Sequence, residues 1–159
     1  MVRRIDMAQE PHAPEMTLEQ VAAIKAALAE AGATLANVLA AHSLTRDEWK
    51  RAETHYLEQM AQEALAGGEP NVAETFAAAF AKAQDALAPV PNLTVEEWAR
   101  LRFAISVVGV EKAVAARGLS TADYLRAERH FARVFARDAA AAERYSEAFY
   151  EAESGRQKT

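Results

Sequence analysis

Residues 44–56 read LTRDEWKRAETHY, and residues 119–131 read LSTADYLRAERHF. When the match is extended to residues 64 and 139, about 7 of the 21 aligned positions are identical and about 6 more are conservative. The second residue of each copy carries a hydroxyl group and is followed three positions later by a carboxylate, which is the capping box of a helix start. Apolar and aromatic residues then recur at helical spacing. The two stretches therefore predict equivalent helices within an internal duplication.

The duplication extends in both directions along the chain. Upstream, the segment that begins at Thr17 matches the segment that begins at Thr94. Downstream, two aromatic residues of the first copy have partners in the second, and the pairs are Phe76 with Tyr145 and Phe80 with Phe149. The sequence therefore predicts the following parts: a mobile tail at 1–16, helical unit 1 at 17–88, a proline-rich linker at 89–93, helical unit 2 at 94–153, and a tail at 154–159.

Composition favours helices throughout the chain. Hydrophobic residues make up 51% of the 159 residues, with alanine, the best helix former, dominating this group, while glycine and proline are few. We expect an all-α protein of two tandem homologous units, about four helices each and one of them short, packed into a single bundle-like body. We expect Asn71 to cap the last helix of unit 1. The aromatic residues predicted to be mainly buried are Trp49, Tyr56, Phe76, Phe80, Tyr124, Phe131, Tyr145 and Phe149.

Charge and hydropathy exclude several functional classes. The net charge of −5 argues against generic binding of nucleic acid, which depends on Lys and Arg. No run of about 18 apolar residues could span a bilayer, and the first residues lack the apolar core of a secretory signal. Cysteine is absent, which removes disulfides, zinc–thiolate sites and a cysteine nucleophile. We expect a cytoplasmic protein with no membrane partner.

Two histidines, His55 and His130, occupy the same place in the two copies. His55 has Glu58 one helical turn away, but Arg133 stands at the matching place in unit 2, so the spacing does not repeat a pair of metal ligands. We interpret both histidines as structural and expect no metal, no cofactor, no catalytic residue and no enzymatic activity. The acidic residue two positions before each histidine is expected to pair with a cation one turn away on its own helix.

Four arginines lie along one face of the predicted helix of unit 2, at spacings i, i+3, i+7 and i+11, and they are Arg126, Arg129, Arg133 and Arg137. Unit 1 does not repeat the stripe, because Arg51 aligns with Arg126 but Thr54, Glu58 and Gln62 stand at the other three positions. A solvated charged face is one interpretation, and contact with an acidic surface of a partner protein is the other. We predict this stripe as the partner-binding site. Replacement of Arg129 and Arg133 by glutamate should then leave the fold intact.

Two other functions stay open. The turn at Gly118, between a short and a longer helix, is similar to that of a helix-turn-helix and would suit a nucleic-acid-binding regulator acting through unit 2. The matching helix of unit 1 begins with Arg46, Asp47 and Glu48, whose carboxylates would repel phosphate. The second alternative is an enzyme with a cleft between the units.

The repeated pattern is Leu, a hydroxyl residue, an acid and an aromatic, followed by Ala-Glu-x-His-aromatic. It resembles small duplicated helical modules of unknown function in bacterial genomes, some encoded near type VI secretion or polymorphic toxin genes. The resemblance implies an accessory role as an adaptor, chaperone or immunity protein. We therefore expect a non-enzymatic protein–protein interaction module in a bacterial cytoplasm.

Overall fold

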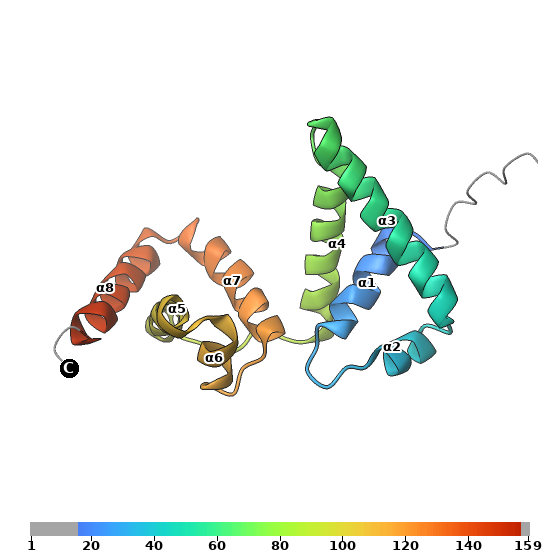
Figure 1. The fold of residues 1–159 in the computed structure, drawn as a ribbon. Helices are drawn as coiled ribbons and strands as arrows, with labels where there is room; N and C mark the ends of the chain where they lie inside the picture. The colour runs from blue at the N-terminus through green and yellow to red at the C-terminus, as the bar shows by residue number, and fades with distance from the viewer. Residues whose placement is uncertain (1–15, 157–159) are drawn as a thin grey trace, which may run out of the picture.

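The computed structural model describes residues 16–156, which form eight α-helices and no strand (Figure 1). The predicted all-α class is confirmed. Within the described residues, no helix combines the length and the apolar character needed to cross a bilayer. The helices are α1 Leu18–Leu28, α2 Leu35–Ala41, α3 Arg46–Ala66, α4 Asn71–Leu87, α5 Val95–Val108, α6 Val110–Ala115, α7 Thr121–Phe135 and α8 Ala139–Arg156.

Four helix starts carry the capping box that the sequence predicts. In each, a hydroxyl oxygen accepts a hydrogen bond from the backbone N–H three positions on, and the side chain at that position accepts one from the backbone of the cap. Such a cap stabilises a helix by about 1 kcal/mol because it satisfies N–H groups that have no partner inside the helix. The four capping residues are Thr17, Thr45, Thr94 and Ser120.

The predicted cap of α4 is wrong. Pro70 stands at the cap position and Asn71 is already helical, with no side-chain hydrogen bond at the cap. The carboxylate of Glu63, on α3, accepts hydrogen bonds of 2.9 and 3.0 Å from the backbone N–H of Val72 instead. A tertiary contact across the α3–α4 turn thus replaces the local cap.

The buried apolar residues form two clusters, one in the first half of the chain (α1–α4) and one in the second half (α5–α8). The first is built around Ile24 and Trp49, and the second around Trp98, Leu101 and Phe131. In each half the first helix packs against the last, α1 against α4 and α5 against α8. Figure 1 shows the two groups side by side, and α4 meets α7 where they join.

The ends of the folded region differ from the predicted tails. Met16 was expected in the N-terminal tail, but its side chain is only 6% exposed and packs into the first cluster. Helix α8 continues to Arg156, so residues 154–156 are helical rather than a tail. The remaining residues of the predicted tails, 1–15 and 157–159, lie outside the described part.

The aromatic residues divide into two groups. Trp49, Tyr124 and Phe131 are buried as predicted. The prediction overstated the burial of the other five, which are only half-buried: Tyr56, Phe76, Phe80, Tyr145 and Phe149. Three of these five line a surface pocket that is described below. Helical spacing identifies the face on which a ring lies but not whether another element covers that face.

Candidate functional site

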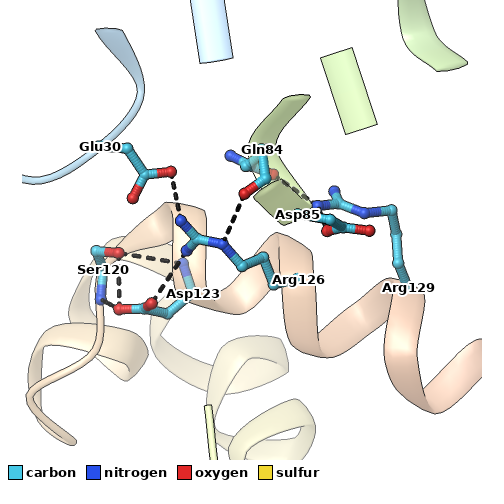
Figure 2. A network of polar contacts seen from close by, with 7 residues as sticks. All are labelled: Glu30, Gln84, Asp85, Ser120, Asp123, Arg126 and Arg129. Carbon is cyan, nitrogen blue, oxygen red and sulfur yellow. Dashed lines mark hydrogen bonds and ion pairs between the residues drawn. The ribbon is translucent and has the colours of Figure 1, made fainter. Parts of the chain in front are cut away.

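The first arginine of the predicted stripe, Arg126, is fully buried at 0% exposure. Its side chain reaches from α7 toward the first half of the chain, as Figure 2 shows. The guanidinium Nε donates a 3.1 Å hydrogen bond to the backbone carbonyl of Gln84 on α4. The two terminal nitrogens bind carboxylates, Nη2 that of Glu30 and Nη1 that of Asp123, the latter at 3.1 Å. Arg126 is therefore held by three internal partners and is shielded from solvent.

Arg129 also points into the junction between the halves. Its Nη2 donates a 2.9 Å hydrogen bond to the side-chain oxygen of Gln84 and forms an ion pair with Asp85. Gln84 itself is fully buried. Because α4 supplies both contacts, Arg129 and Arg126 together tie α7 to α4 (Figure 2). A glutamate at position 129 would place a carboxylate beside Asp85, so the double substitution of Arg129 and Arg133 is no longer expected to be neutral for the fold.

The other two arginines of the stripe are exposed, Arg133 on α7 and Arg137 in the turn after that helix, so the helix that was predicted to carry all four arginines ends before Arg137. The structure therefore divides the four predicted partner-binding residues into an internal pair and a solvent-facing pair. The sequence offered one local signal, since Arg126 follows Asp123 by one turn of α7. The contacts of Gln84 and Asp85 come from the packing of α4 against α7, which has no sequence pattern.

The two repeated histidines have matching surroundings. His55 and His130 are half-buried, and each ring packs edge-on against the aromatic ring of the next residue, with centroids 5.1 Å apart in both places. Among the residues that the structure describes, no group of three or more His, Asp or Glu side chains is arranged to hold a metal ion.

The two repeated glutamates have partners that the sequence did not indicate. Glu53 pairs with Lys25 of α1, and Glu128 pairs with Arg102 of α5 at 2.7 Å. These cations come from the first helix of each half, not from one turn away on the same helix as predicted. The ammonium of Lys25 lies 5.6 Å from the centre of the Trp49 ring, and the guanidinium carbon of Arg102 lies 5.7 Å from that of Trp98. Each half thus contains one ion pair beside a tryptophan.

An apolar pocket opens to the surface between α1, α3 and α4, and it is called the groove below. Its volume is about 250 Å³. The ion pair of Lys25 with Glu53 contributes to its lining. Leu57 is 55% exposed there. The apolar residues of the groove are Val21, Tyr56, Leu57, Met60, Phe76 and Phe80.

The aligned positions of the second half are packed with aromatic rings. Phe131 stacks on Trp98 at 5.2 Å between centroids and on Phe135 at 5.8 Å, and Phe135 contacts Tyr145 at 5.1 Å. In the repeat alignment, Trp98 corresponds to Val21 and Phe135 to Met60. The second half therefore carries two larger side chains where the groove of the first half has smaller ones.

The chemistry of the groove is that of a binding surface. Its one charged pair is internally neutralised, and its remaining lining is apolar or aromatic. Exposed apolar surface with a concave shape favours contact with an apolar group of a ligand or of another protein. Sequence analysis missed this site because each lining residue, taken alone, has the spacing of a core residue.

Two tyrosines near the ion pairs have raised pKa values. For Tyr56 the cause is burial, with a contribution from the charge of Glu19. For Tyr124 burial is again the main cause, followed by the 2.8 Å hydrogen bond that its hydroxyl donates to Glu128, while Arg102 acts in the opposite direction.

These raised pKa values predict alkaline destabilisation. Below about pH 10, the normal pKa of tyrosine, both phenols are protonated whether the chain is folded or not, and stability is unaffected. At higher pH the unfolded chain releases these protons more readily, so the free energy of unfolding should fall. Urea midpoints at pH 8 and pH 10.5 measure the effect. Tyr124→Phe should show a smaller fall than the wild type, and an equal fall in both proteins would contradict the assignment.

Comparison of the chain with protein-family models, with curated proteins and with solved structures found no match.

Proposed function

We propose that this chain is a non-enzymatic protein–protein interaction module, an adaptor, chaperone or immunity protein of a bacterial cytoplasm, and that its partner docks in the groove. One observation carries the proposal: the first half leaves an apolar, partly aromatic groove open to solvent, with Leu57 more than half exposed. A concave apolar surface of this kind is costly to leave in water and is typical of an interaction site.

We further propose that the two halves are homologous units produced by duplication and specialised differently. Three matching features support this: a capped first helix, an ion pair between the first and third helices, and an edge-on histidine. The turn before the third helix also matches, because Ser43 and Gly118, which align, both have a positive φ, +56° and +68°. In this proposal the second half supplies a filled core and the first half retains the binding groove.

The exposed arginines can add to the same complex. Arg133 lies on α7 and Arg137 in the turn that follows it, and both are exposed, so they remain available to an acidic region of the partner. Charges at the rim of an interface mainly accelerate association, and their effect decreases with salt.

The experiment begins with affinity capture from the source organism, followed by purification of the captured protein and titration with the purified chain by calorimetry. Met60→Phe introduces the residue found at the aligned position 135 and should weaken the complex at least tenfold, or about 1.4 kcal/mol. Val107→Phe adds the same ring to an exposed site on α5 and should leave affinity unchanged. Arg133→Glu with Arg137→Glu should reduce the association rate at low salt.

Two results would overturn the proposal. If no captured protein forms a complex with the purified chain, the interaction function is wrong. If a complex forms and Met60→Phe has no more effect than Val107→Phe, the groove is not the docking surface.

A further inference from the structure

We propose that the groove binds a basic amphipathic helix of the partner protein, and that this helix inserts one bulky aromatic side chain between α1, α3 and α4. This inference rests on the proposed function and specifies the chemistry of the partner at the same site. It follows from the shape of the groove, from the residues that fill the equivalent region of the second half, and from the charge of the hairpin formed by α3 and α4.

The second half indicates what kind of group fits. There the indole of Trp98 lies in stacked contact with both Tyr124 and Phe131, at 5.6 and 5.2 Å between ring centroids. In the first half, Val21 replaces that indole, and the groove lies beside it. A planar aromatic side chain from outside could therefore make with Tyr56, the residue aligned with Phe131, a contact that the second half makes internally.

The rings that border the groove support the same conclusion. Phe135 of the second half bridges Phe131 and Tyr145, joining the rings of α7 to those of α8. In the first half the aligned residue is Met60, an unbranched and adaptable side chain. Met60 and Leu57 on α3 face Phe76 and Phe80 on α4 across the groove. An inserted aromatic ring would restore this bridge.

The surface of α3 suits a helical partner. Apolar residues recur there at i, i+3, i+4 and i+7, which places them on one side of the helix over a length of about 10 Å. Helix-in-groove recognition uses the same spacing of anchors on the bound helix. The residues of this side are Leu57, Met60, Ala61 and Ala64.

Charge selects the polar face of the partner. Between residues 52 and 81 the chain contains five glutamates and neither lysine nor arginine. Two of the five are engaged internally, Glu53 by Lys25 and Glu63 by the backbone of Val72. The other three are exposed, Glu58 on α3, Glu69 in the turn between α3 and α4, and Glu74 on α4, while the exposed cations Arg51 and Lys82 stand just outside this range. A helix with lysine or arginine on its polar face complements this surface, and an acidic helix is repelled by it.

The probe is a fluorescein-labelled 18-residue peptide with leucines and one tryptophan on its apolar face and lysines on its polar face. Two matched peptides serve as controls. One carries glutamate in place of every lysine, and the other carries alanine in place of the tryptophan. Fluorescence anisotropy with the full chain should show binding of the lysine–tryptophan peptide. At low salt, both matched peptides should bind at least tenfold more weakly.

Protein variants locate the peptide on the surface. Met60→Phe and Val21→Trp each introduce the side chain of the second half and should weaken binding at least tenfold, and either variant suffices if the other fails to fold by circular dichroism. Val107→Trp, on the exposed surface of α5, is the matched control and should bind as the wild type. Glu58→Lys with Glu74→Lys should weaken binding of the lysine peptide and reduce its salt dependence.

Other outcomes overturn the inference. Equal or tighter binding of the glutamate peptide, or binding that Met60→Phe leaves unchanged, would show that the partner is not a basic helix in the groove. Self-association of the free chain that Met60→Phe abolishes would assign the groove to a second copy. Tighter peptide binding after removal of residues 1–15 would assign the groove to the chain's own N-terminal segment. The proposed function is judged separately, by the complex with the captured protein.

Discussion

Replacing Arg126 by alanine is expected to lower the free energy of unfolding by about 3 kcal/mol, which is the lower end of the range for breaking a buried ion pair. Arg126 is fully buried, and its loss removes the partner of Glu30 and Asp123 and the donor to the carbonyl of Gln84. Glu30 and Asp123 keep some solvent contact, which softens the penalty, so we expect the lower end of the range.

The repeat itself offers the control for this substitution. Arg51 aligns with Arg126 but is exposed on α3, so Arg51→Ala should change the free energy of unfolding by less than about 0.5 kcal/mol. Urea unfolding followed by circular dichroism measures both variants. A loss below 1 kcal/mol for Arg126→Ala would mean that this network contributes no more than a surface ion pair. Because α4 and α7 join the two halves of the chain, Arg126→Ala should also separate the unfolding transition of the first half from that of the second.

Trp98→Ala is expected to cost about 3–5 kcal/mol, the range for removing a large aromatic residue from a core. The indole is 3% exposed, stacks on Tyr124 and Phe131, and lies under the guanidinium of Arg102. Its removal leaves a space at the centre of the second cluster that the surrounding rings can only partly fill.

Fluorescence distinguishes which half is affected. Trp49 is the other tryptophan and belongs to the first cluster, so its emission in Trp98→Ala reports on α1–α4 alone. Circular dichroism should show a lower urea midpoint than Trp49 fluorescence does. Val107→Ala, on the exposed surface of the same helix, should change stability by less than about 0.5 kcal/mol. Coincident transitions, or a loss below 2 kcal/mol, would contradict this picture of the second core.

Local features of the fold could be predicted from sequence because their causes are local. A hydroxyl residue with an acid or amide three positions later starts a helix through contacts within one turn, and four such starts were identified correctly. The start of α4 was not, because its N–H group is satisfied by Glu63 from another helix. A cap supplied from across a turn has no fixed spacing that a sequence pattern could recognise.

The arginine stripe shows where a local pattern stops being sufficient. Helical spacing predicted four arginines on one side of a helix, but α7 ends before Arg137, and Arg126 and Arg129 are engaged by residues 42 to 96 positions away. Arg51, in the same motif, remains exposed. Burial depends on which helix packs opposite, and only the contact of α7 with α4 makes that difference.

The all-α class, most helix starts and the side of each helix that carries apolar residues follow from the amino-acid sequence, since they depend on backbone hydrogen bonding and on a period of 3.6 residues. Which apolar sides are covered depends on how the helices pack against one another. In the second half, Trp98 and Phe135 are large enough to join the rings of neighbouring helices. In the first half the smaller Val21 and Met60 stand at the aligned positions, and the groove lies between α1, α3 and α4. The two halves therefore differ in the volume of the side chains that lie between packed helices, and the sequence pattern of a single helix does not show this.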